Sequence, residues 1–175
     1  MDAMTKSRIA LISTGGTIEK TYDELHGVLH NEVSVLEVMI ASLQLEGIEI
    51  HRVPLLNMDS LDMTRVEHEL IAETTRELVP KHDGVVIVHG TDTLSVTGET
   101  LFEKLDGLSV PVVLTGAMRP YIMRTSDALQ NLTEAFLAAQ LLSPGVYVVL
   151  HNKVLAFPGV RKDPELGTFT RDAAG

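Results

Sequence analysis

The amino-acid sequence predicts a doubly wound α/β domain, in which a mostly parallel sheet carries helices on both faces. Five short apolar or β-branched segments alternate with segments of helical periodicity. Such an alternation is typical of parallel strands joined by crossover helices. The chain has 175 residues, of which 45% are hydrophobic, and this suits a single domain with a sizeable core.

Five strands are expected from the apolar segments, over residues 8–13, 48–56, 84–88, 110–114 and 146–150. Pro54 marks either the end of the second strand or an edge of the sheet, because proline has no N–H to donate to a neighbouring strand.

Four helices are expected between these strands, over residues 34–43, 64–79, 93–105 and 126–142. Ser34 with Glu37, and Thr64 with Glu67, have the spacing of a capping box. Ser126 is the expected cap of the last helix.

Two segments lack a clear pattern. Residues 19–32 show no periodicity and predict a mobile excursion. Residues 151–175, with scattered Pro and Gly, predict an extension beyond a domain of residues 1–150, or an arm that packs on a neighbouring subunit.

Composition argues against several classes of protein. The net charge is −10, and no cluster of Lys and Arg suggests a nucleic-acid surface. The absence of cysteine excludes disulfides and thiolate metal sites. His26 and His30 have a metal-ligand spacing, but Gly27 argues against a helix there, so we expect loop histidines and no metal or cofactor. No apolar stretch is long enough for a signal peptide or a membrane span, and we expect a cytoplasmic protein.

The motif at residues 89–93 (HGTDT) follows the apolar run of residues 85–88. Ligands of open α/β sheets bind beyond the carboxyl ends of such strands, where the Thr91 hydroxyl and the Asp92 carboxylate are expected to lie. The same residues are also favoured helix caps. At the end of a buried strand, His89 is expected to be a packed core residue.

Residues 14–17 (TGGT) form the second motif, at the end of the first strand. They lack the third glycine of a dinucleotide fingerprint and the lysine of a phosphate loop. Two glycines allow close approach of backbone to a ligand and leave amides free for an anion. Thr17 beside such amides suits a nucleophile next to an oxyanion hole, or alternatively a simple tight turn. A threonine nucleophile needs a base, and Tyr22 offers a nearby phenol.

Three motifs together resemble those of a known protein family. Residues 14–18 (TGGTI), 89–93 (HGTDT) and 116–120 (GAMRP), in this order, resemble the bacterial-type L-asparaginase family, and Ser126, Asp127, Asn131 and Leu132 agree with its next helix. The resemblance extends from Ile9 to about Phe169. It covers the N-terminal domain of the family, and the smaller C-terminal domain has no counterpart in this sequence.

The resemblance implies a role for each of five side chains. Thr17 would be the primary nucleophile, and Tyr22, on a flexible lid, would help to take its proton. Thr91 would act in the second half-reaction, when water attacks the ester. Asp92 would hold the α-ammonium group of the substrate, and Ser60 its α-carboxylate.

The resemblance also implies roles for the backbone. Groups of Gly16, Gly90 and Ala117 would line the pocket, with the amides of Gly16 or Thr91 as candidate oxyanion donors. Apart from the resemblance, Arg119 before Pro120 is expected to hold its loop by a salt bridge, with a role in anion binding as the alternative.

The sequence departs from the family at two places. Leu61 follows Ser60 where the family has glutamine. The family has a lysine on the helix after the GAMRP motif, but this sequence has none between Asn131 and Gly145, where the matching position is about Leu142. Lys153 and Lys162 are the candidate replacements. In the family, the active site includes residues from the C-terminal domain of a neighbouring subunit. The resemblance therefore implies a homo-oligomer, either a dimer or a tetramer.

Three functions follow from these residues. The first is hydrolysis of the small-molecule substrate L-asparagine to L-aspartate and ammonia through a Thr17 ester. The second is hydrolysis of glutamine or of another amide, as in the related amidotransferase subunits. The third is a non-catalytic module that binds asparagine or aspartate and needs a partner chain.

Overall fold

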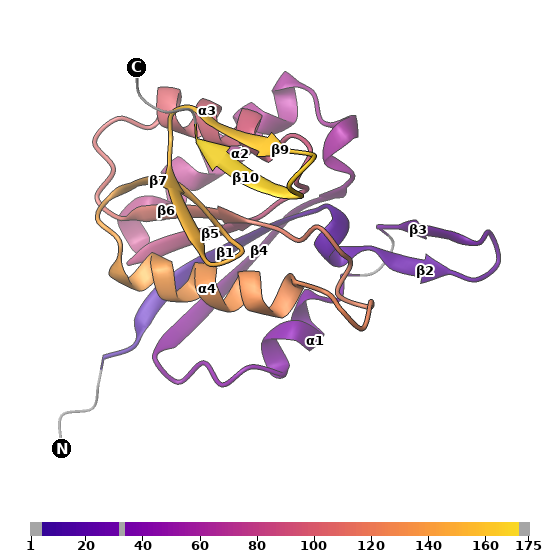
Figure 1. The fold of residues 1–175 in the computed structure, drawn as a ribbon. Coiled ribbons are helices and arrows are strands. Elements are labelled where there is room, and N and C mark those ends of the chain that lie inside the picture. Colours follow the sequence, from indigo (N-terminus) through magenta and orange to yellow (C-terminus); the bar gives the residue numbers. More distant parts are fainter. Residues whose placement is uncertain (1–4, 32–33, 172–175) are drawn as a thin grey trace.

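The main sheet has six strands in the order β4-β1-β5-β6-β7-β8 (Figure 1). This computed structural model describes residues 5–31 and 34–171 of the chain. Five parallel strands confirm the predicted set, and β8 is antiparallel to β7. Their bounds are β1 Ser7–Gly15, β4 Ile48–Met58, β5 Gly84–Val88, β6 Pro111–Thr115, β7 Gly145–Leu150 and β8 Lys153–Ala156. Pro54 lies on β4, an edge strand, as one of its two interpretations predicts.

Four α-helices accompany the sheet: α1 Leu36–Ala41, α2 Arg65–Leu78, α3 Leu94–Lys104 and α4 Ala128–Leu141. The capping box of Thr64 and Glu67 at the start of α2 is confirmed. The one predicted for Ser34 and Glu37 is wrong, because Ser34 donates to Glu19 and Glu37 binds Arg52. Ser126 accepts a hydrogen bond from the Ala128 amide at 3.0 Å, one residue before the observed cap position.

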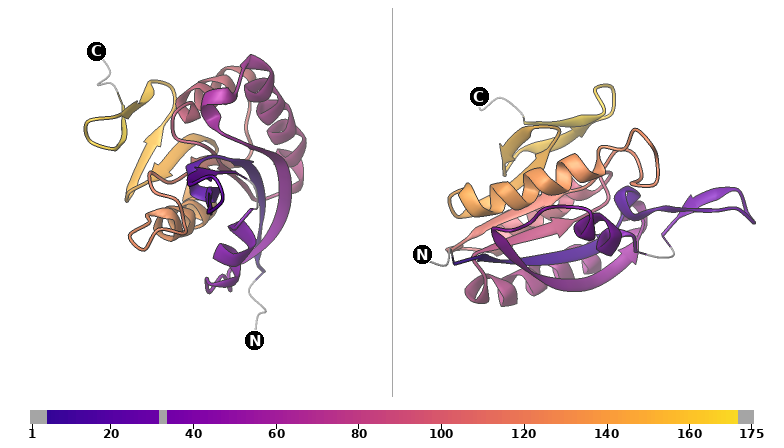
Figure 2. Two further views of the ribbon diagram at one scale, coloured as in Figure 1. Left: turned by 90° about the vertical axis from the view of Figure 1, so that its right-hand side faces the viewer. Right: turned by 90° about the horizontal axis from the view of Figure 1, so that it is seen from below.

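The core has two parts because alternate strand residues point to opposite faces of the sheet. In β1, Ile9 and Leu11 pack with α1 and α4, whereas Ala10 and Ile12 pack with α2 and α3. Figure 2 shows α1 and α4 on one side of the sheet and α2 and α3 on the other. The predicted doubly wound architecture is therefore confirmed.

One crossover has the opposite hand to the others. The steps β4 to β5, β5 to β6 and β6 to β7 all cross the sheet in one direction, yet α2 and α3 lie on one face and α4 on the other. Since βαβ crossovers are right-handed in about 98% of cases, the crossover through α4 is the left-handed one. The loop that enters α4 must change faces, and it reaches the 3-10 helix of residues Thr17–Glu19 after β1, where the Tyr121 amide donates to the Ile18 carbonyl.

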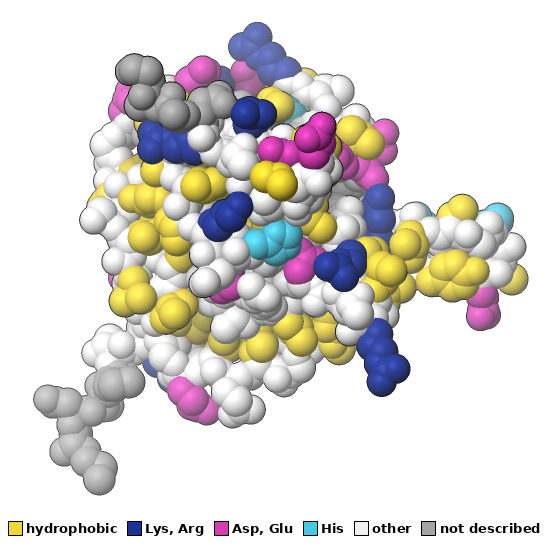
Figure 3. Space-filling view, in the orientation of Figure 1, with side chains coloured by type: hydrophobic (Ala, Val, Ile, Leu, Met, Phe, Trp, Pro, Cys, Tyr) yellow, Lys and Arg dark blue, Asp and Glu magenta, His cyan; other side chains and the backbone are white. Residues whose placement is uncertain are grey.

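Residues 19–32, for which no regular structure is predicted, contain a hairpin of β2 Thr21–Asp23 and β3 Val28–His30. Asp23 stabilises its turn by accepting from the Leu25 and His26 amides, and Gly27 supplies a positive φ of 68°. The hairpin projects from the body and carries exposed apolar side chains (Figures 1 and 3). Its mobility stays a prediction.

The segment after Leu150 packs on its own chain. Besides β8, it forms a hairpin of β9 Val160–Asp163 and β10 Thr168–Arg171. Phe157, Val160 and Phe169 are buried in the core. The predicted boundary at residue 150 therefore does not coincide with a break in packing. Contact with a neighbouring subunit stays a prediction, and residues 172–175 of the predicted arm lie outside the described residues.

None of the helices within residues 5–31 and 34–171 is long and apolar enough to cross a membrane.

Candidate active site

Three loops meet beyond the carboxyl ends of β1, β4 and β5, and they touch at Gly16, Ser60 and Gly90. A Cβ added to Gly16 would lie 2.4 Å from the Gly90 Cα, and one added to Gly90 would lie 2.5 Å from the Ser60 Oγ. Gly16 also has φ 81° and ψ −175°, which essentially only glycine adopts. The structure therefore brings the sequence-predicted residues of three separate segments together.

This close packing predicts the effect of Gly16→Ala. Backbone strain of about 1–3 kcal/mol adds to overpacking of about 1–3 kcal/mol against Gly90, so the free energy of unfolding falls by roughly 2–6 kcal/mol. Gly159→Ala is the matched control, since Gly159 has φ 87° but nothing within 4 Å of an added Cβ. Urea unfolding of both variants measures the difference. Equal losses would show that the contact with Gly90 contributes nothing.

Thr17 begins a short 3-10 helix over Thr17–Glu19 and is half-buried. Its hydroxyl makes no hydrogen bond to any of residues 5–31 and 34–171. The Gly16 amide, one of two predicted oxyanion donors, instead donates to the Met58 carbonyl at 3.0 Å. An amide already used in this way is not free for an oxyanion, and the Thr91 amide is the remaining candidate.

Thr91 and Asp92 lie beside a lysine. The Lys162 Nζ donates to the Thr91 Oγ1 at 2.9 Å and to the Asp92 Oδ1 at 2.7 Å. Thr91 is buried, whereas the Asp92 side chain is 40% exposed and open to a ligand. The Lys162 ammonium group thus fixes the position of the Thr91 hydroxyl relative to the Asp92 carboxylate.

The lysine comes from β9. The helix on which the family has a lysine has none in this sequence, where Leu142 is near the matching position, and the structure distinguishes the two candidate replacements. Lys153 lies on β8, where its Nζ donates to the Phe169 carbonyl at 3.4 Å. Sequence reasoning had no signal for this difference, because the position of Lys162 depends on how the β9–β10 hairpin packs.

Ser60 begins a 3-10 helix over Ser60–Asp62, and its side chain is buried. Its Oγ accepts from the Thr93 amide at 3.4 Å, and its carbonyl accepts from the Thr93 hydroxyl at 2.9 Å. The preceding Asp59 forms an ion pair with Lys20, and the hydrogen bond from Lys20 lowers the pKa of this carboxyl. Leu61 is 69% exposed.

The loop after β6 places Ala117, which is buried, next to this cluster. A Cβ added to Gly116 would lie 2.3 Å from the His89 carbonyl oxygen and 3.4 Å from the Thr91 Cγ2. The loop after β6 therefore touches the backbone of His89, the residue directly after β5.

Asp127 holds this loop by accepting from the Met118 and Arg119 amides, both at 3.0 Å, and from the His151 Nε2 at 2.6 Å. Burial alone would raise the pKa of Asp127, but these hydrogen bonds lower it. The Arg119 side chain donates to Thr125 at 3.1 Å, and it forms no salt bridge with a residue of the ranges 5–31 and 34–171, where one was predicted. Sequence reasoning missed His151.

Comparison with known proteins decides the family. The family model "Asparaginase, N-terminal" matches residues 8–168, nearly the whole chain. The chain belongs to the asparaginase family. L-asparaginase of Thermococcus kodakarensis is 31% identical over 160 residues, which are 91% of this chain and 49% of that protein. Its solved structure superimposes with a TM-score of 0.85, covering 94% of this chain and 51% of the other.

Two further relatives differ in name. A probable cytoplasmic L-asparaginase of Campylobacter jejuni has a TM-score of 0.81 and 30% identity, over 95% of this chain and 52% of that one. A glutamyl-tRNA(Gln) amidotransferase subunit of Methanococcus vannielii is 33% identical over 148 residues, covering 83% of this chain and 34% of that protein. This asparaginase-family chain thus spans about half the length, or less, of the relatives it matches.

Tyr22 of this asparaginase-family chain lies on the projecting hairpin and is 60% exposed. The structure shows no hydrogen bond between Tyr22 and Thr17; the Tyr22 hydroxyl faces Gly27 instead, 4.0 Å from an added Cβ. The participation of Tyr22 in the chemistry stays a prediction, and it requires the phenol to come within hydrogen-bond reach of Thr17.

His89 is completely buried, as predicted for a core residue. Its Nδ1 lies 2.8 Å from the Gly90 carbonyl and its Nε2 2.7 Å from the Thr97 hydroxyl. Burial lowers the pKa of His89 to about 4. The neutral ring therefore braces the turn that presents Thr91 and Asp92.

Burial of His89 predicts a pH dependence of stability. Below pH 6.5 the unfolded chain takes up a proton on this residue, whereas the folded chain takes it up only near pH 4. The free energy of unfolding therefore falls as pH drops, by about 1.4 kcal/mol per pH unit for this residue. Urea unfolding between pH 7 and 5 measures the slope. His89→Gln removes this contribution, whereas the exposed His26→Asn keeps it; equal slopes in both variants would contradict the account.

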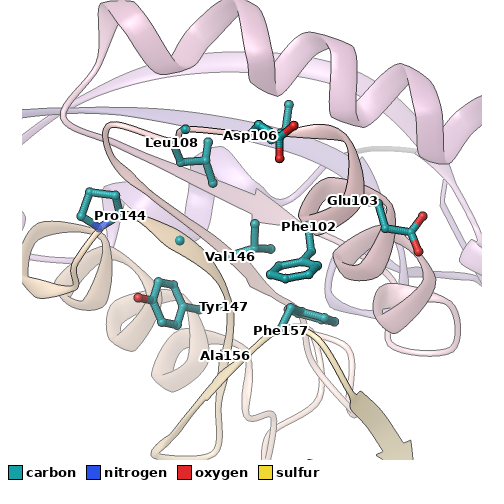
Figure 4. A pocket seen from close by; sticks show the side chains of 12 residues that line it. Phe102, Glu103, Asp106, Leu108, Pro144, Val146, Tyr147, Ala156 and Phe157 are labelled. Carbon is teal, nitrogen blue, oxygen red and sulfur yellow. The ribbon is translucent and has the colours of Figure 1, made fainter.

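Cavities lie both beside this cluster and far from it. One of about 320 Å³ adjoins it and is polar, lined by Lys20, Leu29, His30, Asn31, Asn57, Met58, Asp59 and Asp62. Another of about 570 Å³ lies at the amino ends of β6 and β7, with Phe102 and Phe157 in its wall (Figure 4). It contains none of the motif residues. Within the described chain, no group of three or more His, Asp or Glu is arranged to hold a metal ion.

Proposed function

We propose that this chain hydrolyses L-asparagine to L-aspartate and ammonia, with Thr17 as the nucleophile. The observation that supports this most is Lys162, which holds Thr91 and Asp92 together at the end of β5. A hydroxyl next to a fixed cation suits hydrolysis of an ester, since the cation stabilises the negative charge that develops as the proton leaves.

In the first half-reaction, the Thr17 oxygen bonds to the side-chain amide carbon of the substrate. When the hairpin is closed, the Thr17 proton passes to the Tyr22 phenol oxygen while the phenol's own proton passes on to the amide nitrogen, and the Thr91 amide donates to the oxyanion. The carbon–nitrogen bond then breaks, and the protonated nitrogen leaves as ammonia. The product is an ester between Thr17 and the aspartyl group.

In the second half-reaction, water attacks this ester. Thr91, next to Lys162, accepts a proton from the water while its own hydroxyl proton passes to the Thr17 oxygen, and the ester bond to Thr17 breaks to release L-aspartate. Asp92 binds the α-ammonium group throughout, because its carboxylate is the exposed anion of the site. Ser60 binds the α-carboxylate, and backbone of Gly16, Gly90 and Ala117 encloses the substrate.

Two observations favour a second candidate, an amidase that acts on glutamine or on a larger amide. One relative is named as an amidotransferase subunit, and Leu61 removes a side-chain amide from the substrate loop. As a third candidate, the chain binds asparagine or aspartate without turnover and works with a partner chain. In each case we propose a cytoplasmic homo-oligomer, either a dimer or a tetramer.

Ammonia release from L-asparagine, L-glutamine and a C-terminal peptide amide distinguishes these candidates. We expect kcat/KM to be higher for asparagine than for the peptide amide, because Asp92 and Ser60 bind both charged groups of a free amino acid. The proposal also requires kcat/KM to be higher for asparagine than for glutamine, whose side chain is one methylene longer. A preference for glutamine or the peptide amide would support the second candidate. Thermal stabilisation by asparagine or aspartate without ammonia release would support the third and overturn the proposed activity.

A further inference from the structure

Glu19 is a buried carboxyl group two residues after Thr17, and the proposed chemistry does not use it. Only 2% of the residue is exposed. Burial raises its pKa, while hydrogen bonds from Ser34 and Gly15 and the charge of Arg52 on β4 act in the opposite direction. Burying a carboxylate is costly unless it is hydrogen-bonded, so its presence here needs an explanation.

The two carboxylate oxygens of Glu19 bind different segments. One accepts from the Gly15 amide at 3.2 Å, within the loop that presents Thr17. The other accepts from the hydroxyl of Ser34, which follows the β2–β3 hairpin. We call residues 14–17 the nucleophile loop, and Asn31 and Ser34, which follow β3, the return segment of the hairpin. Glu19 therefore links the nucleophile loop to the return segment.

A second contact joins the same two segments. Asn31, directly after β3, donates its Nδ2 to the Gly16 carbonyl at 2.9 Å. The return segment of the hairpin thus holds the nucleophile loop both directly, at Gly16, and through Glu19, at Gly15. A shift of the hairpin base would be transmitted to the turn that precedes Thr17.

We propose that Glu19 is a positioning residue that couples the orientation of Thr17 to the position of the hairpin that carries Tyr22. The proposal rests on the proposed function, since it assigns Glu19 to the same site. Glu19 touches neither the substrate nor the reacting atoms. It affects the reaction through the geometry of the loop that presents Thr17.

The test compares Glu19→Ala with Glu19→Gln, and uses Glu24→Gln on the exposed hairpin turn as the matched control. Glutamine keeps both contacts, because its carbonyl accepts from Gly15 and its amide donates to the Ser34 hydroxyl. Since misplacement of a reacting group by about 1 Å costs roughly 100-fold, we expect Glu19→Ala to lower kcat for asparagine by about 10- to 100-fold with little change in KM. Glu19→Gln and Glu24→Gln keep most of kcat.

Rescue by the conservative variant is the readout that a general loss of stability would not give. Glu19→Gln keeps one acceptor and one donor, as a protonated Glu19 does, so its kcat and the acid side of its pH profile should follow those of the native chain. Native kcat in Glu19→Ala, or an equal loss of kcat in the alanine and glutamine variants, would overturn the proposal.

Hydrogen exchange separates this proposal from the proposed function. Coupling predicts that Glu19→Ala speeds amide exchange in both residues 14–20 and residues 21–31, while Glu24→Gln does not. If the native chain releases no ammonia from any amide but exchange responds in this way, the proposed function fails and the coupling stands. If ammonia is released but exchange and kcat are both unaffected by Glu19→Ala, the coupling fails and the function stands.

Discussion

Thr17→Ala is expected to abolish ammonia release from L-asparagine. The variant lacks the oxygen that forms the ester, so kcat falls by roughly 10⁴-fold or more, as for other lost nucleophiles. Since the Thr17 hydroxyl makes no hydrogen bond to the described residues, the loss costs little folding free energy. A coupled assay for ammonia measures turnover, and thermal unfolding checks the fold.

Thr133→Ala is the matched control for this variant. Thr133 lies exposed on α4, where its hydroxyl donates to the Leu129 carbonyl, and we expect native turnover. Thr17→Ser should keep a measurable fraction of activity because it retains a hydroxyl. Turnover of Thr17→Ala within about tenfold of the native chain would be too fast for a missing nucleophile and would contradict the assignment.

The second large effect is expected for Lys162→Met. Methionine removes the ammonium group that holds Thr91 and Asp92 and retains much of the apolar stem. Loss of a proton-transfer group costs about 10²- to 10⁴-fold, and we expect kcat to fall within this range. Because the proposed role of Lys162 lies after ammonia has left, rapid-quench measurements should show a burst of ammonia close to one equivalent per site, followed by slow turnover.

Lys153→Met is the control, since Lys153 contacts only the Phe169 carbonyl in the described hydrogen bonds. It removes the same charge from the neighbouring β8 strand and should leave turnover nearly native. If both variants lost activity equally, net charge would account for the effect. If Lys162→Met retained full activity, the contact with Thr91 would have no role in hydrolysis.

The layout of the domain follows from sequence because local and global signals agree. The run at residues 85–88 is fully buried in β5, and Thr64 and Glu67 cap α2 as their spacing predicts. The motif loops then had to meet, since parallel strands place their carboxyl ends at one edge. The contacts among Gly16, Ser60 and Gly90 confirm that expectation.

What sequence did not predict depends on contacts between distant segments. Ser34 and Glu37 have capping spacing, but each side chain finds a partner elsewhere in the fold. Lys162 reaches Thr91 because residues 157–171, which include β9, pack on the domain through the buried side chains of Phe157 and Phe169. The left-handed crossover through α4 likewise depends on which face of the sheet the helix covers, and no local sequence pattern indicates that face.

The central claim is that Thr17 carries the acyl group, and intact-protein mass spectrometry of the quenched reaction tests it most directly. Lys162→Met, mixed with L-asparagine and quenched in acid, should gain the mass of one aspartyl group. Peptide mapping should place this group on the peptide that contains Thr17, and Thr17→Ala in the same background should gain nothing. Turnover by the native chain with no such adduct, or an adduct mapped to Thr91 alone, would contradict the account.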